Sequence, residues 1–203
     1  SLVCRGAKYS YFLMFFFAVP FMYETETIMR LWLKNYPPEA PLFLRLSMIG
    51  TLFDILGNAT ANAAWATGNV KRYYIIIGGV GCLVFPLSWM AFFLGMDAYA
   101  SYIVFAVIYL ILVFLKLYII KGLINFPVAE FCKSVFGRII PVTVLSFILP
   151  ALVYFNMEES LLRTILVIAV SCISTMFLVY SIGMTESERK KVIQMIKNKI
   201  SKK

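Results

Sequence analysis

Six long apolar segments are the feature of this sequence that most restricts what it can fold into. A helix that crosses the roughly 30 Å hydrocarbon core of a bilayer needs about 20 mostly apolar residues. Six stretches come near or exceed this length: Tyr9–Tyr23, Leu42–Ala66, Tyr73–Leu94, Tyr99–Ile120, Ile139–Phe155 and Leu162–Ile182. The sequence therefore predicts an all-α, polytopic transmembrane helix bundle with about six spans. Since the first and fifth stretches are short, we expect neighbouring residues to extend them, or the two helices to tilt little.

A soluble helical protein is the alternative, and composition argues against it. The chain is 62% hydrophobic and only 14% charged. Helices of a soluble bundle carry a polar face at the 3.6-residue period, whereas these segments are apolar nearly all round. An apolar solvent is therefore required, and we expect an integral membrane protein.

The sequence lacks the common motifs of metalloproteins and nucleotide-binding enzymes. It has no histidine, and Cys4, Cys82, Cys132 and Cys172 are too far apart for a zinc, haem or iron–sulfur motif. Walker, GxGxxG and GxSxG motifs are also missing from it. We expect no metal, no cofactor and no nucleic-acid partner.

Basic residues indicate the orientation, because short cytoplasmic loops retain Lys and Arg. With the N-terminus inside, both termini are cytoplasmic and four of the 19 basic residues lie outside, namely Arg30, Lys34, Arg45 and Arg163. The other fifteen are assigned to the cytoplasm: Arg5, Lys8, Lys71, Arg72, Lys116, Lys121, Lys133, Arg138, Arg189, Lys190, Lys191, Lys197, Lys199, Lys202 and Lys203. The sequence thus predicts a multi-pass protein with both ends in the cytoplasm.

The first residues do not have the pattern of a signal peptide. Residues 1–8 lead directly into an apolar segment that no small-residue cleavage site follows. Since a natural reading frame begins with Met and this chain begins with Ser1, we expect it to be a fragment of a longer protein.

The second predicted span differs from the others because it carries a polar stripe. At 100° per residue, its polar side chains and one tryptophan fall within an arc of about 100°. They are Thr51, Asp54, Asn58, Asn62 and Trp65. A carboxylate within a bilayer is costly unless it faces water, a partner or a substrate, so we interpret the stripe as the wall of a substrate path. The alternative is a helix–helix seam, because amides form interhelical hydrogen bonds and small residues beside them permit close approach, namely Gly57, Ala59, Ala61, Ala63 and Ala64.

The segment after residue 184 is predicted to form a separate basic, amphipathic cytoplasmic tail, residues 185–203, following a membrane lobe of residues 1–184. Thr185 and Glu188 have the spacing of a capping box. Apolar residues then repeat on one face opposite Lys190, Lys191, Lys197 and Lys199. This pattern is typical of a helix lying on an anionic membrane surface, and the alternative is a solvated tail.

Three short stretches carry a resemblance to a known family. They are Leu31-Trp32-Leu33, the run from Ala66 to Tyr73 (ATGNVKRY), and Gly183-Met184-Thr185 followed by Glu188-Arg189. In order and spacing they resemble the polysaccharide and O-antigen flippases of the multidrug/oligosaccharidyl-lipid/polysaccharide exporter superfamily. The resemblance extends over almost the whole chain and corresponds to the C-terminal half of such a protein.

The resemblance implies a transporter and not an enzyme. Such proteins have two lobes and move an undecaprenyl-pyrophosphate-linked oligosaccharide across the bacterial cytoplasmic (inner) membrane by alternating access, for lipopolysaccharide or other surface polysaccharide synthesis. The implied partners are the lipid-linked oligosaccharide, membrane lipids, the missing N-terminal lobe and a polysaccharide polymerase.

Two other functions stay open on the sequence alone. A multidrug exporter of the same superfamily could use Asp54 as a cation or proton site. A polytopic glycosyl or acyl transferase is disfavoured, because such chemistry usually needs a His base or clustered carboxylates. The acid pairs Glu24/Glu26 and Glu158/Glu159 are interpreted as solvated loop charges.

Overall fold

The computed structural model describes residues 2–33, 35–68, 70–190 and 193–194, and within them the chain is all-α. The helices are α1 Leu2–Tyr23, α2 Thr25–Trp32, α3 Ala40–Ala66, α4 Val70–Cys82, α5 Val84–Phe93, α6 Ala100–Ile124, α7 Val128–Phe131, α8 Gly137–Asn156 and α9 Leu161–Leu178. Two π-helical turns, η1 Cys132–Phe136 and η2 Val179–Gly183, adjoin α8 and α9. The predicted fold class is confirmed.

Among the described residues, six helices are long and apolar enough to cross a membrane. They run over Leu2–Tyr23, Ala40–Ala66, Val70–Phe93, Ala100–Ile124, Val128–Asn156 and Leu161–Gly183. Each contains one predicted span, give or take a residue at one end. The two short predictions are lengthened by their neighbours, to 22 residues for the first span and 29 for the fifth. The protein is therefore a multi-pass membrane protein.

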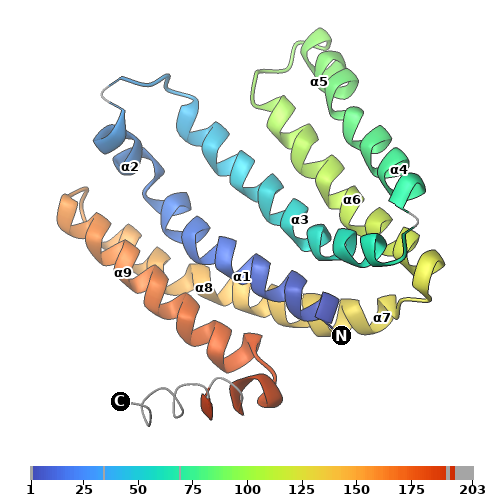
Figure 1. Cartoon of the computed structure of the whole chain (residues 1–203). Coiled ribbons are helices and arrows are strands. Elements are labelled where there is room, and N and C mark those ends of the chain that lie inside the picture. The colour runs from blue at the N-terminus through green and yellow to red at the C-terminus, as the bar shows by residue number, and fades with distance from the viewer. Residues whose placement is uncertain (1, 34, 69, 191–192, 195–203) are drawn as a thin grey trace.

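The six spans alternate in direction, so that the connections between them lie at two opposite ends of the bundle (Figure 1). The start of α1, the α3–α4 turn, the α6–α7 turn and the end of η2 lie together, and we call this the terminal end. The α1–α2–α3, α5–α6 and α8–α9 connections lie at the opposite end, which we call the distal end. Both described ends of the chain are thus on one side of the bundle.

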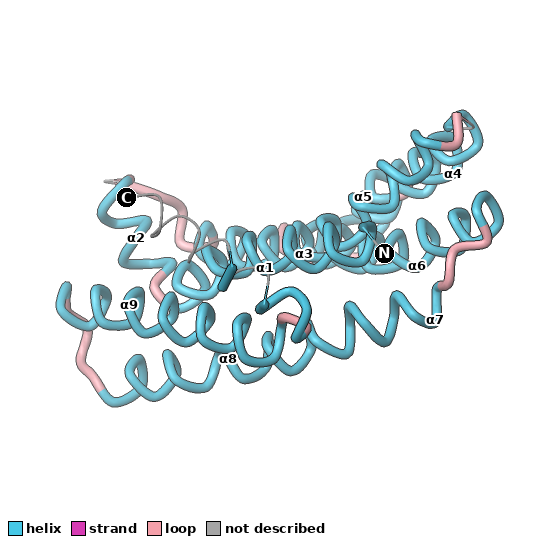
Figure 2. The backbone as a smooth tube through the Cα atoms, turned by 60° about the horizontal axis from the view of Figure 1, so that its bottom comes forward, coloured by secondary structure: helices cyan, strands magenta, loops and turns pink. Residues whose placement is uncertain are grey.

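The central packing in the bundle is between α3 and its neighbours. It packs against α6 on one side and α1 on the other, while α1 also contacts α8 and α9. α4 and α5 pack mainly on α6, and Figure 2 shows them on the opposite side of the molecule from α8 and α9. The buried core follows this order, with Phe15 of α1, Leu56 of α3, Leu117 of α6 and Val142 of α8 all in one cluster.

Two glycines let α3 and α6 approach closely. A Cβ atom built on Gly50 would lie 2.4 Å from the ring of Phe105, and one built on Gly57 would lie 2.5 Å from Cδ of Lys116. The two positions are seven residues apart, so they share one face of α3. Small residues at such a seam allow the dispersion contacts that hold membrane helices together.

The third span is broken at Leu83, between α4 and α5. Pro86 explains the break, because its ring excludes the carbonyl of Cys82 from a regular turn and it has no N–H to donate. Pro20 in α1 and Pro141 and Pro150 in α8 lie within continuous helices.

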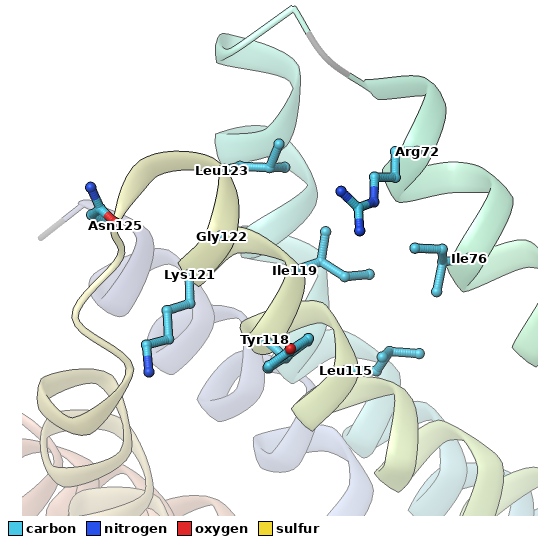
Figure 3. A pocket seen from close by; sticks show the side chains of 9 residues that line it. All are labelled: Arg72, Ile76, Leu115, Tyr118, Ile119, Lys121, Gly122, Leu123 and Asn125. Carbon is cyan, nitrogen blue, oxygen red and sulfur yellow. The ribbon is translucent and has the colours of Figure 1, made fainter.

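Toward the terminal end, a cavity of about 520 Å³ lies between α4 and α6 and is lined partly by Arg72 and Lys121 (Figure 3).

Candidate functional site

Asp54, the acidic residue of the polar stripe, forms an ion pair across the α3–α6 seam. Nζ of Lys116 donates to Oδ1 of Asp54 at 3.0 Å. The Lys116 side chain is 7% exposed and that of Asp54 is 34% exposed. The aliphatic part of the Lys116 side chain packs against Gly57 of α3, because the glycine has no side chain to occupy that space. The lysine is thus fixed inside the bundle, while the carboxylate retains an open side.

This position of Lys116 corrects the charge assignment made from sequence. We counted Lys116 among the cytoplasmic loop charges, but it lies within α6, buried, eight residues before the helix ends. The signal that could have identified it is its place inside the predicted span Tyr99–Ile120, because an intramembrane cation needs a partner. Lys8, also counted as cytoplasmic, is likewise buried within α1.

The lower part of the stripe lines a polar cavity of about 370 Å³ near the terminal end of α3. Asn58, Asn62 and Trp65 face it from α3. Gly6 and Ser10 of α1, Tyr74 of α4 and the alanines Ala59 and Ala61 complete the wall. Sequence reasoning missed Tyr74, whose hydroxyl accepts a 2.6 Å hydrogen bond from Nε1 of Trp65. The bond fixes the two aromatic rings beside the amides.

Within the part of the chain that the structure describes, neither amide side chain links α3 to another helix by a hydrogen bond. Asn58 and Asn62 are both exposed, and no hydrogen bond from either side chain occurs among the described residues. Their donors and acceptors are available to water or to a ligand in the cavity. The close contact of α3 with α6 is made by Gly50 and Gly57, and Gly57 is one of the small residues named for the predicted seam.

Thr51 lies apart from this cavity. Its hydroxyl donates to the backbone carbonyl of Ser47 at 2.8 Å within α3. The stripe therefore divides into three parts: Thr51 bonded to its own helix, Asp54 paired with α6, and the lower residues on the cavity. The structure brings Asn58, Asn62 and Trp65 together on one wall, with Asp54 one turn above them on the same helix.

At the distal end, Glu24 is buried and not the solvated loop charge expected from sequence. It is 1% exposed. Nε of Arg163 donates to it at 3.0 Å, and the hydroxyls of Thr27 and Thr164 donate at 2.9 and 3.0 Å. The Arg163 guanidinium also lies 4.6 Å from the centre of the Tyr154 ring. A carboxylate so fully bonded is structural, and it is not free to act as a general base.

At the terminal end, the capping box is confirmed. The Thr185 N–H donates to Oε2 of Glu188 at 2.8 Å, and the Glu188 N–H donates to the Thr185 hydroxyl at 3.3 Å. The same carboxylate accepts from Nζ of Lys8 at 2.7 Å and lies 3.4 Å from Nε of Arg5. Burial raises the pKa of Glu188, but hydrogen bonds from Lys8 and Thr185 outweigh it and lower the pKa to about 2.

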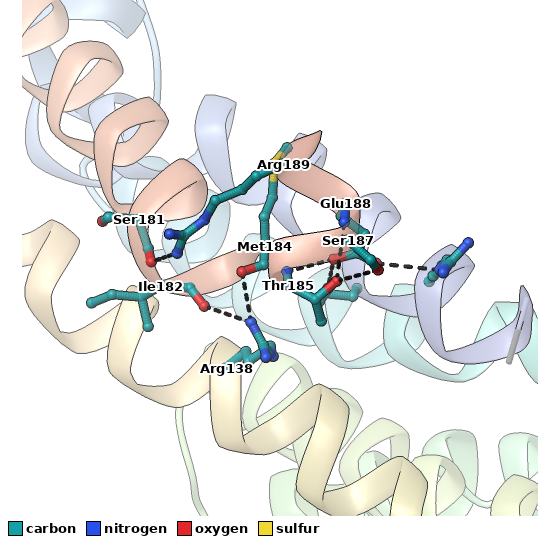
Figure 4. Close-up of polar contacts among 10 residues, drawn as sticks. Arg138, Ser181, Ile182, Met184, Thr185, Ser187, Glu188 and Arg189 are labelled. Atoms are coloured by element: carbon teal, nitrogen blue, oxygen red, sulfur yellow. Dashed lines mark hydrogen bonds and ion pairs between the residues drawn. The ribbon is translucent and has the colours of Figure 1, made fainter. Parts of the chain in front are cut away.

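The carbonyl groups that end η2 are also bonded (Figure 4). Arg138 of α8 donates to the carbonyls of Ile182 and Met184 at 3.1 and 2.7 Å, and Arg189 donates to the carbonyl of Ser181. The start of the tail is therefore docked on α1 and α8. Lys190 is exposed, while Lys191, Lys197 and Lys199, the other predicted membrane-surface lysines, lie outside the described residues.

Comparisons of the chain with protein-family profiles, with curated proteins and with solved structures return no match. Function must therefore be argued from the site itself.

Proposed function

We propose that this chain is the C-terminal lobe of a flippase that moves undecaprenyl-pyrophosphate-linked oligosaccharide across the bacterial cytoplasmic membrane. The cavity lined by Asn58, Asn62, Trp65 and Tyr74 carries the proposal. Amides and hydroxyls offer both donors and acceptors to sugar hydroxyl groups, and aromatic rings offer flat apolar faces with a polar tip. A sugar presents both kinds of surface.

The membrane setting supports the same interpretation. Exposed polar side chains in a spanning segment are costly against lipid and are typical of water-filled substrate paths. Asp54, one turn above the amides, is the described carboxylate furthest inside a span and is open on one side. In a two-lobed exporter this wall would face the opposite lobe, with the polyprenyl tail remaining in lipid.

The ion pair favours a flippase over a multidrug cation exporter. A cation exporter needs a carboxylate that is free for the drug or for a proton, whereas the charge of Asp54 is already balanced by Lys116 at 3.0 Å. The hydroxyl-rich sugar part of the proposed substrate is better suited to such a balanced site. The function is then transport, with no chemical step on the sugar.

The test uses the whole transporter, in cells that depend on it for surface polysaccharide, and measures polymer exported per inserted molecule. Asn62→Ala and Asn58→Ala should each lower export several-fold with normal insertion, because each removes hydrogen bonds to the sugar. Thr51→Val is the matched control on the same helix, since among the described residues its hydroxyl bonds only to the carbonyl of Ser47.

The ion pair is tested by removing both charges together. Asp54→Asn alone leaves the buried Lys116 charge without a partner and should lower protein abundance by costing about 3–5 kcal/mol of stability. The double change Asp54→Asn with Lys116→Met should restore abundance while export per molecule stays low. Normal export from this double variant and from both asparagine variants would contradict the proposal, and energised efflux of lipophilic cations would indicate the exporter instead.

A further inference from the structure

The cavity between α4 and α6 is separate from the polar cavity described above and is larger, at about 520 Å³. Its wall is mixed. Ile76, Leu115, Ile119 and Leu123 supply apolar surface, and Arg72, Lys121, Tyr118 and Asn125 supply polar groups. Gly122 lies in the middle of this wall, and a Cβ built there would meet no atom within 4 Å. A depression with a charged rim thus opens on the outside of the bundle.

The two cations of this cavity lack ion-pair partners. Arg72 extends from α4 toward α6, and Lys121 extends from α6 on the side away from α4 (Figure 3). Both are exposed, and within the described ranges no carboxylate pairs with either. By contrast, Lys8, Lys116 and Arg163, which are buried, each bind a carboxylate. The uncompensated charges call for an anionic ligand.

The level of the cavity indicates where that ligand comes from. Arg72 is the third residue of the span Val70–Phe93, and Lys121 is three residues before the end of the span Ala100–Ile124. Both therefore lie at the terminal end, where spanning helices meet lipid headgroups. The apolar residues of the wall continue along the same helices toward the bilayer interior, as acyl chains do.

We propose that this cavity binds an anionic phospholipid, with the headgroup between Arg72 at one edge and Lys121 at the other, and an acyl chain along Ile76 and Leu115. The guanidinium fork of arginine matches phosphate geometry, and basic pockets between spanning helices are suited to anionic headgroups. Tyr118 and Asn125 add donors for the polar part of the headgroup. The proposal is independent of the transported substrate.

The test is native mass spectrometry of the detergent-purified chain titrated with phosphatidylglycerol or phosphatidylcholine. Phosphatidylglycerol should bind more tightly. Arg72→Gln and Lys121→Gln should each weaken its binding about five-fold, which is about 1 kcal/mol per charge. Gly122→Leu should weaken it too, because it fills the depression and keeps both charges. Lys71→Gln is the control, since Lys71 is exposed beside Arg72 but does not line the cavity.

Circular dichroism confirms that each variant retains its helices before the titration. Four results would overturn the proposal. Equal binding of the two lipids would show that the charges of the cavity are not needed. An effect of Lys71→Gln as large as that of Arg72→Gln would indicate general electrostatic attraction to the basic end of the protein. No effect of Gly122→Leu would show that the lipid does not bind in the cavity. Displacement of the lipid by millimolar inorganic phosphate would make the ligand a free anion.

Discussion

At the scale of single residues, the contact between Gly57 and Lys116 determines how the ion pair is built. The lysine stem fills the space that a side chain at position 57 would occupy. Its ammonium group thereby reaches Asp54 at 3.0 Å while remaining buried. The glycine is required for packing, although glycine within a helix costs about 1 kcal/mol relative to alanine.

Gly57→Ala should therefore destabilise the protein by about 1–3 kcal/mol despite the gain in helix propensity, because the new Cβ crowds Lys116 and loosens its pair with Asp54. Gly79→Ala is the matched control in α4, where a Cβ meets nothing within 4 Å. It should be neutral or stabilising. The measurement is the free energy of unfolding in detergent for both variants. Equal effects would show that the packing of Lys116 against Gly57 does not contribute to stability.

The residues of the candidate site were only partly predictable. Helical periodicity places Asp54, Asn58 and Asn62 on one face, but it cannot say which neighbour each of them meets. Lys116 and Glu24 were misassigned because the charge rule treats any Lys, Arg or acid near a span end as solvated. The partners are 62 residues apart in the Asp54–Lys116 pair and 139 residues apart in the Glu24–Arg163 pair. Such pairing depends on tertiary packing, which a local sequence pattern does not predict.

At the scale of elements, the tail and α1 form one unit through Glu188. The capping box was predictable because it is local, with its two residues three apart. Its attachment to Lys8 was not, because the partner lies 180 residues away. The outcome is that a short helical turn at 186–190 is held against the first span.

The docking of the tail should depend on pH in a defined window. Since the pKa of Glu188 in the folded chain, about 2, lies below its ordinary value of 4.5, its ion pairs with Lys8 and Arg5 contribute fully above about pH 4.5 and are lost as pH falls toward 2. A spin label at Ser187 should be equally immobile from pH 8 to 5 and become mobile between pH 4.5 and 2.

Glu188→Gln should leave this label mobile at every pH, whereas Glu186→Gln, at an exposed position on the same turn, should change nothing. A label that stays immobile in Glu188→Gln would show that Arg138 and Arg189 alone hold the tail.

At the scale of the whole molecule, the fold was largely predictable, because a bilayer permits few kinds of backbone structure. Backbone groups in lipid must be bonded within their own helix, so each apolar run of sufficient length becomes a span. All six runs did so. Pro86 marks where the third span can break, but Pro20, Pro141 and Pro150 lie in continuous helices, so the sequence alone does not say which proline interrupts its helix. The two π-helical turns depend on the local surroundings of a few residues and were not predictable either.

The charge distribution predicts that the terminal end is cytoplasmic. In a background in which the four native cysteines are replaced, Cys at Asp97 or Glu158 should react from outside with a membrane-impermeant thiol reagent. Cys at Lys71 or Lys133 should react only after the membrane is opened. All four positions are exposed, so accessibility within the fold does not bias the comparison, and the reverse labelling pattern would invert the topology.

The pairing of the first span with the last has a consequence for biogenesis. Of the six spans described, α1 is synthesised first; it carries Lys8 and is followed directly by Glu24, and the folded protein buries both charges. Their partners, Glu188 and Arg163, are synthesised 180 and 139 residues later. Until the chain has been synthesised as far as Glu188, Lys8 lacks its carboxylate partner, and α1 cannot pack in its final position without an unpaired buried charge. The final packing of α1 is thus a late event in the synthesis of these six spans.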